Sequence, residues 1–330
     1  MNSLTSSAAT LVAMRYGFLG PETTFTHQAL MQTLDERQGG DLVPFSSVAA
    51  AVANLVDGGV DAMMAPIENS VEGGVSGTLD VLAATGGISI VAEQIVPITF
   101  VLAAKTPLSL ADIRAVYSHT HAQAQCQAFV REHVPGASAQ PALSTAEAAR
   151  AIAAMDDSDP RALESAAICS ALAAEHFGLE VIAEGIEDNA GAQTRFVLVQ
   201  RDSSVPARTG ADKTTIVAHL AHNRAGSLLT MLEVFNANGV NLSRIESRPI
   251  GDALGRYSFS LDLEGHIEDR RVAAALRGLH RICTRVVFLG SYPKADASSP
   301  IIEDHNSDTA FDSARVWIDS ILSRVEDTDG

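Results

Sequence analysis

The sequence predicts an α/β protein in which two small α/β lobes are followed by a domain of the ferredoxin-like βαββαβ type. Strand-like apolar runs alternate with amphipathic helical patterns from residue 15 to residue 200, which is typical of a mostly parallel, layered sheet. After a polar segment at 201–212 that contains Pro206 and Gly210, the order changes to strand, helix, strand, strand, helix, strand.

The first lobe is expected to begin with a strand at 15–19, closed by Gly20-Pro21, and a helix with apolar residues at helical spacing from Phe25 to Leu34. A strand at 41–45, a helix through 48–56 with Ser46 or Ser47 as N-cap, and a buried strand at 61–66 follow. In the second lobe, strands are expected at 99–104, 115–118 and 194–200, and helices at 121–133, 145–154 and 170–177. The chain would cross between the lobes near 98 and 186 and leave a cleft where ligands usually sit.

The third domain is expected to have strands at 214–220, 242–249, 257–263 and 284–290, with helices at 225–238 and 267–278. The segment 294–309 is rich in Ser, Asp and Pro, which is typical of a mobile tail. A final amphipathic helix places Phe311, Ile318, Leu322 and Val325 on one stripe, which would be buried on its own chain or on a partner.

The composition, with 46% apolar residues among 330, describes a packed globular protein. A formal charge of -17 argues against nucleic acid or an anionic membrane as partner.

No basic leader with an apolar core marks the N-terminus, so a cytoplasmic location is expected. Cys126, Cys169 and Cys283 are too far apart for a metal knuckle and are taken as reduced thiols, Cys126 and Cys169 packing on helices.

Five short motifs occur in a fixed order along the chain. They are Gly20-Pro21-Glu22-Thr23-Thr24-Phe25, Pro-Ile-Glu-Asn-Ser at 66–70, Ser118-His119, Ser144-Thr145-Ala146 and Thr194-Arg195-Phe196. Each alone is weak, because polar loop residues and strand threonines are common for structural reasons. Together they resemble the prephenate dehydratase family. Gly226-Ser227-Leu228-Leu229 and Asn-Leu-Ser-Arg-Ile-Glu-Ser-Arg-Pro at 241–249 look like the signatures of that family's ACT domain, so the resemblance covers about 15–290.

The resemblance implies a two-lobed, periplasmic-binding-protein-like catalytic region and a ferredoxin-like ACT domain. The expected divisions are a flexible extension at 1–14, a catalytic domain at 15–202, a linker at 203–212, an ACT domain at 213–291, and a flexible tail with a terminal amphipathic helix at 292–330. Lobe 1 is expected at about 15–98 plus 186–202, and lobe 2 at about 99–185. No chorismate mutase activity is expected, and Met14 could be the true start.

The implied activity is that of a lyase in phenylalanine biosynthesis, which converts prephenate to phenylpyruvate, carbon dioxide and water. Aromatisation drives the reaction, so no cofactor and no metal are expected, and the sequence has no dinucleotide or phosphate-binding loop. Thr194 is expected to donate a hydrogen bond to the departing hydroxyl. The full set of catalytic residues carried over is Thr194, Arg195, Glu68, Asn69 and Ser70, and the substrate-binding set is Thr24, Phe25, Ser118, Thr145 and Phe196.

Arg195 is the cation within a catalytic motif, and its guanidinium matches a carboxylate. On a regular strand, however, Thr194 and Arg195 point to opposite faces. Two alternatives therefore stay open for Arg195. In the first, the side-chain carboxylate of prephenate is held either by Arg195 or by the helix N-termini after Gly20-Pro21, Ser118 and Ser144. In the second, Arg195 forms a structural ion pair.

The ACT-like segments imply feedback inhibition by phenylalanine, bound where two such domains pair. The residues expected to bind it are Gly226, Ser227, Leu228, Leu229, Asn241, Leu242, Glu246 and Ser247. Gly226 at a helix start leaves room for a close ligand, and the helix N-terminus suits a carboxylate. A homodimer or homotetramer is therefore expected.

Five positions depart from the family pattern: Thr23 stands in place of Gly, His27 in place of an acidic residue, Thr120-His121 in place of Pro-Gln, and Ala192 in place of Asn. These departures leave arogenate (cyclohexadienyl) dehydratase activity open as an alternative. A non-catalytic phenylalanine-sensing protein is a second alternative, and a solute-binding protein of the same two-lobed architecture is a third.

Overall fold

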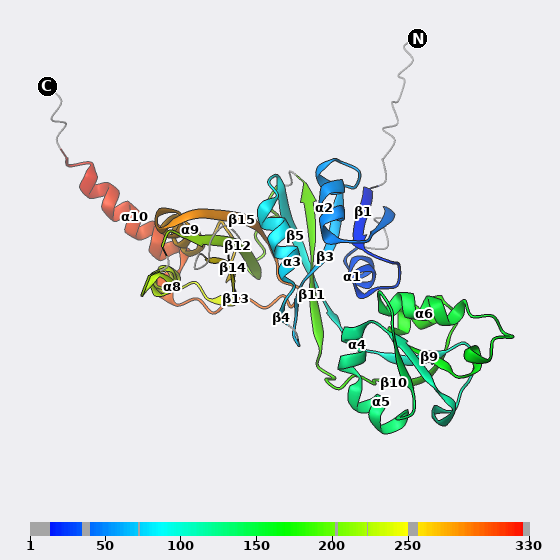
Figure 1. Cartoon of the computed structure of the whole chain (residues 1–330). Helices are drawn as coiled ribbons and strands as arrows, with labels where there is room; N and C mark the ends of the chain where they lie inside the picture. Colours follow the sequence, from blue (N-terminus) through cyan, green and yellow to red (C-terminus); the bar gives the residue numbers. More distant parts are fainter. Residues whose placement is uncertain are drawn as a thin grey trace, which may run out of the picture. The chain divides into compact units, whose positions relative to one another are not determined.

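The computed structural model describes residues 14–34, 40–71, 73–201, 204–222, 224–249 and 257–325 (Figure 1). The chain divides into two compact units, Met1–Gly73 with Gln94–Phe196, and Gly74–Glu93 with Val197–Gly330. The strands β4 (Gly73–Gly74), β5 (Ile88–Pro97) and β11 (Gln193–Arg201) have residues in both. Within the described ranges, no helix is long and apolar enough to cross a lipid bilayer.

The first lobe of the first unit is built on a sheet with the strand order β2-β1-β3-β11-β5. Strand β1 pairs in parallel with both β2 and β3, as expected when helices connect successive strands. Helix α1 begins after Thr24 and α2 after Ser47, whose hydroxyls accept backbone N–H groups of the first turn. The elements are β1 (Met14–Leu19), α1 (Phe25–Thr33), β2 (Gly40–Phe45), α2 (Val48–Val56) and β3 (Ala62–Asn69).

The second lobe has its own sheet, in the order β10-β6-β9-β7-β8, with α6 and α7 packed against it. Strand β9 is fully buried, yet its Ser-Ala-Ala-Ile-Cys sequence has little β-branched content, so the sequence did not predict it. The elements are β6 (Val101–Ala104), η1 (Leu110–Asp112), β7 (Ala115–Ser118), α4 (Thr120–Gln125), α5 (Gln127–His133), β8 (Ser138–Pro141), α6 (Thr145–Ala153), η2 (Pro160–Leu163), β9 (Ser165–Cys169), α7 (Ala171–His176) and β10 (Glu180–Glu184).

The single helix predicted at 121–133 is wrong, because the chain breaks it at Cys126 into α4 and α5. Cys126 has a non-helical backbone (φ -119°, ψ 20°), and Asp188 accepts the Ala128 N–H at 3.0 Å in the first turn of α5. Cys126 is buried in the core of the lobe, while Cys169 lies on β9 rather than on a helix. Burial raises the pKa of each thiol to about 12, so neither is a nucleophile at neutral pH.

The second unit contains the predicted βαββαβ arrangement, which is confirmed. Its antiparallel sheet has the order β13-β14-β12-β15, and α8 and α9 cover one face over a core that includes Met231, Phe235 and Leu261. The elements are α3 (Ser76–Ala84), β12 (Asp212–Leu220), α8 (Ser227–Ala237), β13 (Leu242–Pro249), β14 (Tyr257–Glu264), α9 (Arg270–Ile282), β15 (Cys283–Pro293), η3 (Asp304–Asn306) and α10 (Asp308–Leu322).

The terminal amphipathic helix is present as α10, with Ser307 as its N-cap. Its start is held by Asp308, which accepts from Arg208 Nη1 at 2.7 Å and from the Arg270 N–H at 2.9 Å. Trp317 and the other large apolar residues of its C-terminal half are exposed. The domain boundaries given above stay predictions.

Candidate active site

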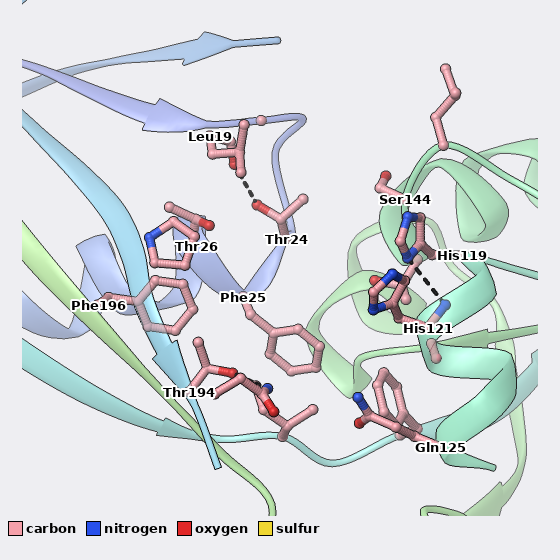
Figure 2. Close-up of a pocket in the computed structure, with 18 of the residues that line it drawn as sticks. Leu19, Thr24, Phe25, Thr26, His119, His121, Gln125, Ser144, Thr194 and Phe196 are labelled. Carbon is pink, nitrogen blue, oxygen red and sulfur yellow. Dashed lines mark hydrogen bonds between the residues drawn. The ribbon is translucent and has the colours of Figure 1, made fainter. Parts of the chain in front are cut away.

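A pocket of about 480 Å³ within the first unit is lined by residues of both lobes (Figure 2). Six of the predicted site residues line it: Thr24, Phe25, Asn69, Thr145, Thr194 and Phe196. The other lining residues are Leu19, Gly20, Thr26, Ser46, Pro66, Ile98, Phe100, His119, His121, Ala122, Gln125, Leu143 and Ser144.

The best-defined polar contact in the pocket joins Thr194 on β11 to Asn69 at the end of β3. Asn69 Nδ2 donates to Thr194 Oγ1 at 2.8 Å, while Asn69 Oδ1 accepts the Val71 N–H at 2.8 Å. The Val71 contact decides which end of the amide is oxygen, so Asn69 must be a donor toward Thr194. Because the hydroxyl oxygen accepts this hydrogen bond, its own O–H can donate to a ligand in the pocket.

Ser70 and Arg195, which were also predicted to be catalytic, do not line the pocket, and neither does Glu68. The Ser70 hydroxyl accepts the Gln193 N–H at 2.9 Å and so joins the end of β3 to β11. Arg195 Nη1 lies 3.3 Å from Glu68 Oε2, and the Arg195 side chain is 7% exposed. The strand alternation thus turns Arg195 away from Thr194, and the contacts support the structural ion pair over a carboxylate-binding role. The catalytic roles of these three residues stay predictions.

Two helices begin at the pocket with their first-turn N–H groups near its wall. Thr24 caps α1 by accepting the His27 N–H at 3.3 Å, and Ser144 caps α6 by accepting the Glu147 N–H at 3.0 Å. Such N-termini favour anions. Ser118, predicted to bind substrate, instead is fully buried and donates to the Ile168 carbonyl at 2.7 Å, so it positions the end of β7 and does not line the pocket.

His119, His121 and Gln125, which the sequence did not single out as site residues, line the pocket on the side of α4 (Figure 2). The signal available in the sequence for His119 and His121 was their place within three residues of Ser118, at the C-terminal end of a strand. In parallel α/β sheets, such ends face the ligand-binding crevice.

The remaining walls are apolar and include Phe25, Ile98, Phe100 and Phe196. Phe25 and Phe100 come from different lobes and meet edge to face, with centroids 5.7 Å apart. Among the described lining residues there is no Lys or Arg, and the part of the chain that the structure describes has no cluster of three or more His, Cys, Asp or Glu suited to a metal ion.

A second candidate site lies in the second unit at the start of α8. Gly226 is its N-cap, with a left-handed backbone (φ 85°) and nothing within 4 Å of a Cβ placed there. Two overlapping pockets of about 530 and 560 Å³ adjoin it: Gly226 and Ser227 line both, and Leu228 and Leu229 line the second.

The predicted effector residues on β13 and directly before it do not join those pockets within one chain. Asn241, Leu242, Glu246 and Ser247 are absent from the described lining of both. Leu242 packs against the domain core, and Glu246 Oε2 lies 3.4 Å from Arg244 Nη1.

Two family models match this chain. The family model described as prephenate dehydratase matches residues 16–204, and the ACT domain model matches 214–281. The chain belongs to the prephenate dehydratase family. The predicted family, fold class and enzyme class are thereby confirmed.

The prephenate dehydratase of Mycobacterium tuberculosis (strain H37Rv) is 40% identical over 301 residues, which cover 88% of this chain and 91% of that protein. A crystal structure of prephenate dehydratase from Arthrobacter aurescens in complex with L-Phe is 48% identical, with a TM-score of 0.86 over 94% of this chain and 99% of that one. GqqA, described as a quorum-quenching acylase, is 29% identical, with a TM-score of 0.73 over 84% of this chain and 97% of its own. The fold of this family is therefore also found in a protein described by another activity.

Two positions that depart from the family pattern contact each other beside the pocket. Thr23 has a left-handed backbone (φ 67°), and its N–H donates to His27 Nδ1 at 3.0 Å, which requires this nitrogen to be unprotonated. Burial lowers the pKa of His27, His176 lowers it further, and Glu22 opposes the shift. At pH values between the usual His pKa of about 6.5 and this lower value, His27 binds more protons in the unfolded chain than in the folded chain. The free energy of unfolding therefore falls as the pH falls below about 6.5.

His27→Gln should remove this dependence because glutamine does not titrate. We expect the thermal midpoint of the wild type to fall relative to that of His27→Gln as the pH is lowered from about 7.5 to about 5. Thermal unfolding at both pH values measures it, and an identical difference at the two pH values would contradict the assignment.

Proposed function

We propose that this chain catalyses the decarboxylative dehydration of prephenate to phenylpyruvate in phenylalanine biosynthesis. The observation that carries the proposal is the Asn69-to-Thr194 hydrogen bond at the wall of a pocket that Phe25, Phe100 and Phe196 also line. This hydrogen bond orients the Thr194 hydroxyl as a donor among aromatic side chains. The arrangement suits a substrate in which one departing oxygen must accept a hydrogen bond.

In the reaction, the bond from the ring to its carboxylate breaks and the electron pair enters the ring. The ring-to-hydroxyl bond breaks, and the departing oxygen takes a proton and leaves as water. Thr194 donates its O–H toward that oxygen, and the net proton comes from solvent through it, because a threonine hydroxyl is a poor acid. Phe25, Phe100 and Phe196 disfavour the charged carboxylate relative to neutral carbon dioxide.

We further propose that L-phenylalanine inhibits the enzyme by binding at the start of α8. The exposed first turn of α8 beside Gly226 suits the amino-acid carboxylate, and Leu228 and Leu229 supply apolar surface. The L-Phe complex of the related Arthrobacter aurescens protein supports this ligand. Since the β13 residues do not reach these pockets in one chain, a second copy is proposed to supply them, which requires a homodimer or homotetramer.

Gly226→Ala should weaken the inhibition. Alanine at φ 85° costs about 1–2 kcal/mol, which displaces the helix start and raises the phenylalanine concentration for half-inhibition about tenfold. Gly178→Ala is the matched control, because Gly178 also has positive φ (64°) and open space but lies outside these pockets. Equal inhibition of Gly226→Ala and the control would contradict the site.

The activity itself is tested by incubating the purified full chain with prephenate and, separately, with arogenate. We expect phenylpyruvate from prephenate at a much higher kcat/KM than phenylalanine from arogenate. Turnover of arogenate alone would move the assignment to that substrate. A folded protein that turns over neither would support a non-catalytic sensor or another activity of this fold. A cytoplasmic location stays a prediction.

A further inference from the structure

The proposed substrate carries two negative charges into a pocket whose described lining contains no Lys or Arg. In prephenate, both carboxylate-bearing groups are attached to the ring carbon opposite the one that bears the hydroxyl. If Thr194 holds the hydroxyl, the charged end of the substrate must lie on the other side of the pocket. A dianion in apolar surroundings is costly unless positive charge or N–H donors meet it there.

The far side of the pocket carries two histidines, which are the lining residues able to become cationic near neutral pH. Figure 2 shows His119 and His121 at the start of α4, across Phe25 from Thr194. Their rings stack with centroids 5.1 Å apart and 28° between the planes. Two adjacent imidazolium ions would repel each other, so the pair is suited to carry one positive charge.

The cap of α4 favours a neutral His119. His119 Nδ1 accepts the N–H of His121 at 3.4 Å as the N-cap of α4. Protonation of this nitrogen would remove the acceptor, so the cap favours neutral His119 with its proton on Nε2. His121 is exposed, and its side chain lines the pocket.

We propose that protonated His121 binds a carboxylate of prephenate, with neutral His119 beside it, and thereby sets the affinity for the substrate. The inference rests on the proposed function. The charged groups around α4 are already paired: Glu147 with Arg150 on α6, Asp188 with the Ala128 N–H, and Glu187 with the Phe100 N–H. None of them lines the pocket.

The test is the pH dependence of kcat and KM for prephenate in the full-length wild type, His121→Gln and His121→Lys. The carboxylates of the substrate stay ionised from about pH 6 to 9, so a change in KM reports the enzyme. We expect the wild-type KM to rise about tenfold as the pH rises through the histidine range, since loss of one charge-assisted hydrogen bond is of this size. His121→Gln should show the high KM throughout, and His121→Lys the low KM.

His133→Gln is the matched control, because His133 lies in the same lobe on α5 and does not line the pocket. It should keep the wild-type KM profile. A His121→Gln variant with the wild-type KM and the wild-type pH profile would overturn the inference while leaving the proposed function intact. Absence of prephenate turnover in the wild type would instead remove the proposed function.

Discussion

Thr194→Val is expected to lower kcat for prephenate by about 10²- to 10³-fold, the usual effect of removing one oriented donor to a developing negative charge. Valine keeps the shape of threonine, and the side chain at 194 is buried beside Phe196, so the fold should tolerate it. Removing the hydroxyl also leaves the Asn69 amide without the acceptor that it contacts at 2.8 Å. Steady-state kinetics with prephenate measure the effect.

Thr194→Ser is the matched control, because serine retains the hydroxyl and should keep most of kcat. Asn69→Ala should lower kcat by a smaller factor, since Asn69 orients the Thr194 hydroxyl through the amide that Val71 holds. If Thr194→Val retained wild-type kcat, the leaving hydroxyl would have to be protonated elsewhere in the pocket.

Lys213→Met is expected to lower the free energy of unfolding by about 3–5 kcal/mol, the cost of removing one partner of a buried ion pair. Lys213 Nζ lies 2.8 and 3.1 Å from the two carboxylate oxygens of Glu93, whose side chain is 1% exposed. Methionine keeps the length of the lysine stem but supplies no donor. Chemical denaturation of the two proteins at the same pH measures the difference.

Two controls separate burial from charge removal. Lys213→Met with Glu93→Gln should recover part of the loss, because the amide removes the buried negative charge. Arg315→Met breaks an exposed pair with Asp312, with side chains 67% and 43% exposed, and should change the free energy of unfolding by less than about 1 kcal/mol. A Lys213→Met effect as small as that of Arg315→Met would show that the buried pair is not held as described.

The sequence predicts most of the fold because apolar periodicity marks the elements whose one face is buried. The βαββαβ order after residue 212 is read directly from such patterns. The fully buried strand β9 and the break at Cys126 were not predicted, because apolar periodicity marks neither of them. Alanine-rich β9 has no alternation, and the break depends on Asp188, which is distant in sequence from Ala128.

The active site was predictable only in part. Motifs led to the prediction of Thr194 and Asn69, which both line the pocket. The alternation of side chains along a strand indicated that Arg195 would not point into the pocket with Thr194, and its ion pair with Glu68 agrees with this. Ser118 shows the limit of motif transfer: its place at the end of β7 was predicted, but its hydroxyl is used by the Ile168 carbonyl. A substrate-binding role for His121 could not be predicted from the sequence. It follows from the absence of Lys and Arg from the described lining of the pocket, which is known only once the chain is folded.

The Thr194 hydroxyl is proposed to assist the departing oxygen of prephenate. The most direct measurement is a single turnover, with enzyme in excess over prephenate, that follows phenylpyruvate and carbon dioxide together in wild type and Thr194→Val. We expect equal amounts of both products on one time course in wild type, and a Thr194→Val protein that binds prephenate but forms both products about 10²- to 10³-fold more slowly. Equal single-turnover rates in the two proteins would contradict it.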